Sequence, residues 1–295
     1  MASLKAALVR AAIGASGALS LENQRRIGRR LGRLAWRLDL EPARITRINL
    51  AACFPELAER DRRALARASL EHTGMLATEL GAVFRWPRER WEALVVSVRG
   101  EELIEGAQAA GRGVLILIPH FGNWEFLALA LGRYRPTALY DPPRIPGLER
   151  PLRAARDRAG AKLLPIGAGG LRGFYRALAA GEMVALLPDQ VPERHAGVYA
   201  DFFGRPALTM TFVHRLLQRA DPVVLLGSAM RCPGGFAVGY TDLGRALHGP
   251  DPAASARAMN RAIEALVRRD PAQYQWEYKR FKRPPPGTPD PYRRA

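Results

Sequence analysis

The sequence predicts an α/β fold, with a mostly parallel central sheet flanked by helices and a helical region before it. From about residue 95, short apolar runs alternate with amphipathic stretches, a pattern typical of parallel strands joined by helices. Before residue 95, apolar residues recur at helical spacing instead. Hydrophobic residues make up 48% of the 295 positions, which is enough for a sizeable core.

Residues 1–93 are expected to be helical and to include an interfacial amphipathic segment. Between residues 21 and 38 an apolar stripe runs beside an arginine stripe. The first comprises Ile27, Leu31, Leu34 and Leu38, and the second Arg26, Arg30, Arg33 and Arg37. This arrangement suits the headgroup level of a membrane, and it equally suits a core-facing helix with a solvated basic edge. No uncharged run here reaches the ~20 residues that span a bilayer, so no transmembrane helix is expected.

Residues 94–284 are expected to form the α/β core. The predicted strands cover residues 113–119, 136–140, 161–166, 183–188, 222–230 and 236–243. The predicted helices cover residues 123–133, 147–160, 169–180, 209–219 and 252–269. The stretch 194–211 is interpreted as a loop followed by a helix start, with Thr209 as a possible cap. Residues 285–295 are expected to form an extended, Pro-rich basic tail.

The charge balance is strongly basic, with a formal net charge of +17 and a pI of about 10.9. Nucleic acid, an anionic membrane surface and an acidic protein all fit such a balance. The chain contains no recognisable helix-turn-helix, zinc-finger or RNA-binding aromatic signature, so no nucleic-acid partner is expected. Cys53, Cys232 and the histidines show no ligand spacing, so neither a metal nor another cofactor is predicted.

A histidine and an acid follow the first predicted strand of the core. His120 comes directly after the apolar run, and Glu125 lies five positions later, beyond a Gly122-Asn123 turn that offers a helix N-cap. Ligands bind at this end of parallel strands. On one continuous helix the two residues would face different directions, but a loop histidine can fold back onto a carboxylate in the first helical turn. The spacing therefore predicts His120 as a general base, with Glu125 fixing its tautomer.

No serine or cysteine nucleophile adjoins the pair, which favours direct attack by an external hydroxyl on an activated acyl group. The alternative is a histidine satisfied by local backbone and a solvated Glu125. Asp189 and Gln190 follow another predicted strand and are expected at the same sheet edge, in the active-site wall, where they would orient polar groups of the substrate or arginine side chains. A Pro-Asp-Gln run also suits a plain turn. Arg194 and Arg205 are candidate phosphate ligands. The basic run 279–283 could hold anionic lipid or a carrier protein, or form a solvated edge.

The hexapeptide HFGNWE, residues 120–125, resembles the H-x4-D/E motif of glycerolipid acyltransferases. Its Gly-Asn-Trp interior is similar to the late acyltransferases of lipid A biosynthesis, of the lauroyl and myristoyl type. Further blocks resemble that family in the same order along most of the chain. They are residues 48–57, 70–84, 181–190, 202–211 and 274–287. Where the family usually carries an arginine after the tyrosine of a Tyr-Arg-Pro arrangement, this chain has Asp141, and Arg144 lies nearby as a candidate phosphate ligand.

The resemblance implies a glycerolipid acyltransferase-like fold and transfer of a fatty acyl group from an acyl carrier protein or coenzyme A thioester. The acceptor would be a hydroxyl of a phosphoglycolipid, most simply a lipid A precursor. Backbone N–H groups near Gly122 and Asn123, or an arginine, would stabilise the oxyanion. The implied location is the cytoplasmic side of the inner membrane, without a membrane span. Transfer to another glycolipid, such as a phosphatidylinositol mannoside, and a non-catalytic relative that binds lipid or nucleic acid are the alternatives.

Overall fold

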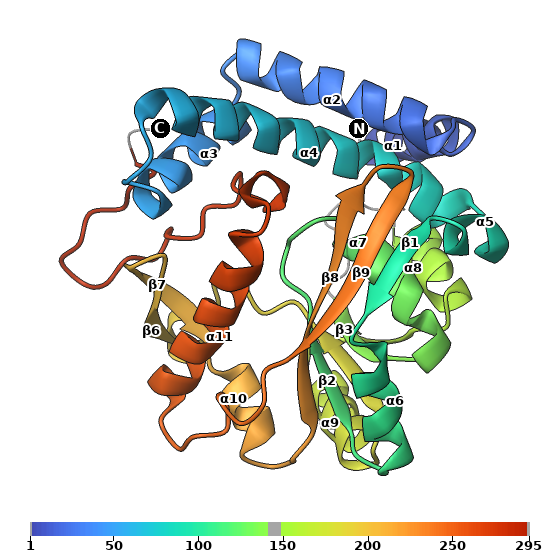
Figure 1. The fold of residues 1–295 in the computed structure, drawn as a ribbon, viewed down its shortest axis with the longest axis vertical. Helices are drawn as coiled ribbons and strands as arrows, with labels where there is room; N and C mark the ends of the chain where they lie inside the picture. The colour runs from blue at the N-terminus through green and yellow to red at the C-terminus, as the bar shows by residue number, and fades with distance from the viewer. Residues whose placement is uncertain (1, 141–148, 294–295) are drawn as a thin grey trace.

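The computed structural model describes residues 2–140 and 149–293, and most of the strands it contains form one seven-stranded sheet (Figure 1). These strands are β1 (Val95–Arg99), β2 (Val114–Leu117), β3 (Thr137–Tyr140), β4 (Lys162–Pro165), β5 (Met183–Leu186), β8 (Val223–Cys232) and β9 (Gly235–Asp242). Their order is β1-β9-β8-β2-β5-β3-β4. All neighbours are parallel except β8 and β9, which form an antiparallel hairpin. The predicted fold class is confirmed.

All six predicted strands are present, but the sequence analysis missed β1 and a separate two-stranded sheet. That sheet pairs β6 (Gly197–Phe202) with β7 (Arg205–Met210), where a loop and a helix start were expected. Two residues join the strands, Phe203 with φ 50° and Gly204 with φ 69°. Positive φ at both positions is the geometry of a tight hairpin turn. Thr209 is therefore a strand residue, and the prediction that it caps a helix is wrong.

Helices cover both faces of the large sheet, and alternate residues of β2 show where the two cores lie. Leu115 and Leu117 belong to one core with α9 and α11, whereas Val114 and Ile116 belong to the other with α6 and α7. The core helices are α6 (Glu101–Ala109), α7 (Trp124–Ala130), α8 (Glu149–Arg158), α9 (Ala168–Ala179), α10 (Phe212–Leu217) and α11 (Pro252–Val267). Strand β2 is thus buried on both sides, and its carboxyl end opens into a loop.

The N-terminal region is helical, as predicted. Its helices are α1 (Ala2–Gly17), α2 (Leu21–Arg37), α3 (Glu41–Cys53), α4 (Glu59–Arg85) and the short α5 (Arg88–Glu92). Figure 1 shows α2 and α4 lying one above the other, over the tip of the β8–β9 hairpin. Their backbones touch: a Cβ on Gly32 would lie 2.2 Å from the carbonyl oxygen of Leu70. Only glycine permits this approach.

The apolar stripe on α2 is exposed, so it does not face the core of the protein. Ile27, Leu31, Leu34 and Leu38 are 39%, 50%, 49% and 60% exposed, and Leu8 of α1 is 61% exposed. The face that packs against α4 instead carries small and polar residues, including Gly28, Gly32 and Arg25. Within the described ranges, no helix combines the length and apolar character needed to cross a bilayer.

Candidate active site

The loop after β2 carries His120 at the predicted edge of the sheet. The imidazole is buried, with 9% of the residue exposed, and it packs against the indole of Trp124 at a ring-centroid distance of 4.9 Å. Strand β5 lies beside β2 in parallel, so the loops that follow the two strands emerge at the same edge. The loop after β5 contains Asp189 and Gln190, and the structure brings both to the histidine.

Asp189 holds the imidazole. Its Oδ1 lies 2.7 Å from Nδ1 of His120, and its Oδ2 accepts the backbone N–H of His120 at 2.9 Å. The ring nitrogen that faces a carboxylate carries the proton, which leaves Nε2 with a lone pair. The side-chain amide of Gln190 donates to this Nε2 at 3.1 Å. The tautomer is assigned from these contacts, and it is the one that a base acting through Nε2 requires.

Tyr274 completes the buried contacts of Asp189, and sequence reasoning did not identify it. Its hydroxyl donates to Oδ2 of Asp189 at 3.0 Å, and the residue is 5% exposed. The backbone around it pairs with the histidine loop: Phe121 and Tyr274 form an antiparallel bridge, and the N–H of Gln275 donates to the carbonyl of His120 at 3.0 Å. The loop is therefore fixed from the C-terminal part of the chain as well as by Asp189.

The electrostatics favour an ionised Asp189 beside an imidazole that gains protons easily. Burial lowers the pKa of His120, but the Asp189 carboxylate outweighs burial, with added contributions from Glu277 and Glu125, and the net shift is upward. Burial raises the pKa of Asp189, but His120 and the Tyr274 hydroxyl outweigh it, and the net shift is downward. The pair behaves as one coupled unit whose carboxylate stabilises an imidazolium.

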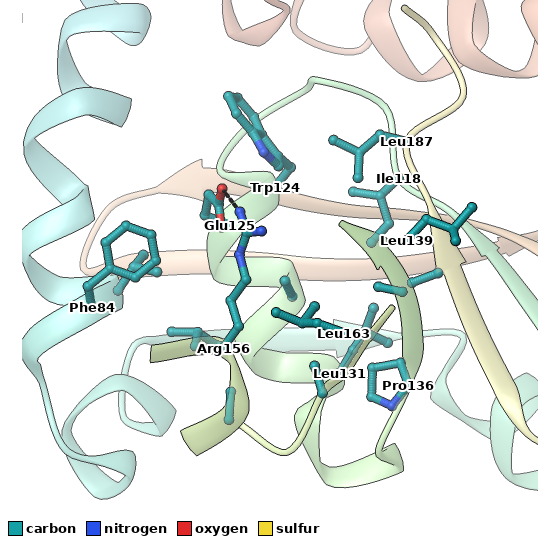
Figure 2. Close-up of a pocket in the computed structure, with 17 residues that line it drawn as sticks. Phe84, Ile118, Trp124, Glu125, Leu131, Pro136, Leu139, Arg156, Leu163 and Leu187 are labelled. Carbon is teal, nitrogen blue, oxygen red and sulfur yellow. Dashed lines mark hydrogen bonds and ion pairs between the residues drawn. The ribbon is translucent and has the colours of Figure 1, made fainter. Parts of the chain in front are cut away.

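Glu125 is not the group that holds the imidazole, which differs from the prediction. It lies in the first turn of α7, and its Oε1 accepts from Nη2 of Arg156 at 2.7 Å. Figure 2 shows Arg156 reaching from α8 across a pocket to this carboxylate. Glu125 is the second residue of α7, and its side chain points into the pocket. Asp189, and not Glu125, contacts Nδ1 of the imidazole. Glu125 acts on His120 through its charge alone.

The pocket that Glu125 and Arg156 share is otherwise apolar. Trp124 lines it next to His120, and Pro136 and Leu131 line it at a distance from Trp124 (Figure 2). Its walls are aliphatic and aromatic side chains from α4, α7, β3, β4 and β5 and from the residues that follow β2 and β5, including Phe84, Ile118, Ala128, Leu139, Leu163 and Leu187. Apolar groups of a ligand would be buried here, next to one ion pair.

Gly122 and Asn123 face the protein interior, so the expected contacts with substrate are not available to them. Asn123 is 0% exposed. Its Oδ1 caps α7 by accepting the N–H of Phe126 at 2.9 Å, as predicted, and its Nδ2 donates to Glu79 at 2.9 Å. The backbone N–H of Gly122 donates to Gln273, and that of Asn123 to Ala229, each at 2.9 Å. These N–H groups are engaged and are not oxyanion donors in this conformation.

Glu79 ties this loop to the N-terminal helices, and it was not predicted. It is fully buried on α4 and pairs with Arg25 of α2 at 2.7 Å and with Arg231 of β8 at 2.8 Å. A charge this deep needs such partners. The sequence indicates its burial only weakly. A single glutamate in the helical pattern of residues 59–85 is normally interpreted as solvent-exposed when its partners in the fold are unknown.

The remaining predicted arginines lie away from the histidine or outside the described residues. Arg144, with Asp141, is in the latter group. Arg194 is exposed and bonds the hydroxyl of Tyr199 at 2.7 Å. Arg205 is exposed at the start of β7, beside the proline-rich C-terminal segment. No contact with the histidine loop is recorded for either side chain in the described part of the chain.

The basic run 279–283 is not a free cationic cluster. Arg280 is 3% exposed and donates to the carbonyl of Leu208 at 2.7 Å. Lys279 pairs with Glu41 and Arg283 with Glu193, at 2.8 and 2.7 Å. Among the described residues, no three histidine, cysteine or acidic side chains are grouped as metal ligands would be.

Comparison with known proteins bears on what this site does. A family model described as bacterial lipid A biosynthesis acyltransferase matches residues 5–283. The chain belongs to this family. It is 31% identical over 271 residues to the lipid A biosynthesis lauroyltransferase of Escherichia coli K12, covering 90% of this chain and 88% of that protein. It is 29% identical to the palmitoleoyltransferase of the same organism, covering 88% and 85% of the two chains.

The lipid A biosynthesis myristoyltransferase of Escherichia coli K12 is also 29% identical, over 90% of this chain and 83% of that protein. The resemblance noted from the sequence is therefore confirmed, and the chain is an acyltransferase. The three relatives are named for different acyl groups, so their names do not assign one to this family member. The match spans the histidine loop, the apolar pocket and the segment that carries Tyr274.

Proposed function

We propose that this acyltransferase moves a fatty acyl group from an acyl carrier protein thioester, or a coenzyme A thioester, to a hydroxyl of a lipid A precursor. The proposal rests on the surroundings of the His120 ring. Its Nδ1 is held by Asp189, its Nε2 lone pair is directed away from that carboxylate, and an apolar pocket begins beside its ring. A base next to an apolar pocket fits transfer of an acyl group.

In the proposed step, Nε2 of His120 takes the proton of the acceptor hydroxyl while the hydroxyl oxygen attacks the thioester carbonyl carbon. The C–O bond forms, the C–S bond breaks, and the imidazolium returns the proton to the departing thiolate. The amide of Gln190, 3.1 Å from Nε2, marks the position that the hydroxyl would take and can turn to orient it. Asp189 stabilises the imidazolium between the two proton transfers.

Glu125 acts in this proposal through Arg156. The guanidinium lies at the polar side of the pocket that adjoins the histidine, and it supplies the positive charge that the oxyanion needs. Glu125 fixes its position at 2.7 Å. The engaged backbone N–H groups of Gly122 and Asn123 make such a side-chain donor necessary.

The proposed location is the cytoplasmic side of the inner membrane, with α1 and α2 lying at the headgroup level. The support is the exposed stripe of Ile27, Leu31, Leu34 and Leu38 beside exposed arginines, since apolar and cationic faces together bind anionic bilayers. Replacing Leu31 and Leu34 by glutamine should move the protein from vesicles containing phosphatidylglycerol into the supernatant on sedimentation. Unchanged sedimentation would assign the stripe another role.

Turnover decides the proposed chemistry. The purified protein is incubated with acyl carrier protein thioesters or coenzyme A thioesters and a lipid A precursor, and products are identified by mass. An added acyl group on the precursor, accompanied by free thiol, is the expected result. Thiol release without an acylated lipid would contradict the acceptor. A carrier-protein rate that falls with salt more steeply than the coenzyme A rate would support the carrier protein as donor, because that protein is acidic.

A further inference from the structure

A second pocket, of about 470 Å³, lies between α2, α4 and the end of β8. It shares no lining residue with the apolar pocket beside His120. Its ionisable lining comprises Arg25, Arg29, Arg231, His72, Glu71 and Asp270. The volume falls in the range of small-ligand sites, and the polar lining sets it apart from the acyl pocket.

The carboxylates around this pocket are already engaged. Glu71 pairs with Arg33 at 2.8 Å, and Asp270 accepts the amide of Gln273 at 2.8 Å. Glu79, behind the pocket, forms ion pairs with both Arg25 and Arg231. Arg29 has no carboxylate partner among the described residues, and its guanidinium contacts only the sulfur of Met75, at 3.6 Å. The region therefore keeps an excess of positive charge.

Two buried polar atoms at the pocket lack partners within the described part of the chain. They are Nη2 of Arg231, a residue 8% exposed, and Nδ1 of His72. Burial, together with the charges of Arg231, Arg25 and Arg29, lowers the pKa of His72 to about 3. The ring is therefore neutral at physiological pH and lies in a positive potential. Nη2 of Arg231 is covered in this conformation, so an anion in the pocket would reach it after the side chain turns. A buried guanidinium N–H without an acceptor is costly, which favours that turn.

We propose that this pocket binds a phosphate group, with Arg29 and Nη2 of Arg231 as its main donors. Guanidinium groups suit phosphate because they present several N–H groups in a planar fork with a permanent charge. A free phosphate ion and a lipid headgroup both offer this chemistry. Because Arg29 lies on the side of α2 opposite the exposed leucine stripe, the pocket faces away from the proposed membrane surface, which favours the free ion. The lipid source rests on the proposed membrane association, whereas the free ion does not.

The test compares two substitutions that remove the same charge from the same helix. Arg29→Gln alters the pocket, and Arg30→Gln alters an exposed neighbour that does not line it. Calorimetric titrations use inorganic phosphate in one arm and monomeric dihexanoyl phosphatidylglycerol in the other, with octyl glucoside as the phosphate-free amphiphile. Arg29→Gln should weaken binding on the order of tenfold. Arg30→Gln should leave it within about twofold.

The ring resonances of His72 give a local readout, since they should shift as either probe binds to the wild-type chain. Binding of both probes assigns free phosphate to the pocket, and binding of the lipid alone assigns a headgroup. No binding, binding without a shift of His72, or equal losses in the two variants would overturn the proposal. Arg231→Lys, which keeps a charge near Glu79 but removes Nη2, should behave as Arg29→Gln does. If that variant unfolds, the Arg29 and Arg30 pair decides alone.

Discussion

Two carboxylates approach the histidine loop, and the surroundings of the two differ. Asp189 is 3% exposed, and its two carboxylate oxygens accept hydrogen bonds from the imidazole, a backbone N–H and the hydroxyl of Tyr274. Glu125 lies at the polar side of an apolar pocket and pairs with Arg156. The first carboxylate fixes a proton on one ring nitrogen, and the second fixes a cation near the proposed position of the thioester. The comparison assigns positioning of the imidazole to Asp189 and stabilisation of charge to Glu125. Each variant below tests one of these two roles.

The largest effect is expected on the Asp189 side. Replacing His120 by alanine should lower kcat by about 10²–10⁴-fold, because the proton acceptor is lost. Asp189→Asn should fall in the same range, because an amide that donates to Nδ1 would leave the proton on Nε2. Single-turnover rates with a thioester and acceptor measure both. If Asp189→Asn is as fast as the wild type, the ring contact at 2.7 Å has no part in catalysis.

Glu125 and Arg156 should behave as a unit. Glu125→Gln and Arg156→Gln are each expected to lower kcat by about 10–10²-fold, since each removes part of one charged pair at the pocket. The double variant should lose little more than either single one, because the two changes remove the same interaction. Glu125→Gln combined with Asp189→Asn should instead show nearly additive losses. Additive losses for Glu125 and Arg156 would contradict their common role.

The pH dependence of kcat/KM distinguishes the two carboxylates by the size of the shift that each variant causes. His120 must be neutral to accept a proton, and its pKa in the folded chain is raised, so activity should be lost as pH falls through that raised value. In Asp189→Asn burial remains while the main opposing charge is gone, so the acidic limb should move to lower pH. Glu125→Gln should move it less, because Glu125, like Glu277, contributes less than Asp189. A limb that stays in place in Asp189→Asn would assign it to another group.

Tyr274→Phe should have the smallest effect on kcat, because it changes only the hydrogen bonding of Asp189. The variant keeps the ring in the core and removes one hydrogen bond to Oδ2, 3.0 Å long. We expect kcat to fall about tenfold with KM unchanged, because a hydrogen bond to a charged group contributes ~1.5 kcal/mol. Tyr278→Phe, whose hydroxyl bonds the N–H of Val191, is the matched control. Equal losses in the two variants would indicate a general structural effect.

Periodicity and strand ends predicted much of this site, and tertiary partners account for what they missed. The apolar run before His120 placed this residue at the end of a strand, and the strand before Asp189 indicated the same sheet edge, because side-by-side parallel strands end together. The partner of the imidazole was misassigned, since Glu125 is close along the chain whereas Asp189, 69 positions away, makes the contact with the ring. Glu79 and Tyr274 gave no local signal, because their function depends on groups from other elements.

The bridge between Phe121 and Tyr274 joins two segments that the ribosome makes at different times. Tyr274 lies 85 positions after Asp189 in the chain, so on the ribosome it follows on the order of 4–17 s later. For part of that interval β8, which pairs with β2, is also still to be made, so His120 lacks both this neighbour and the segment that secures its loop. Such a chain would not yet fix the orientation of the His120 ring. Competence would then arrive with the last part of synthesis.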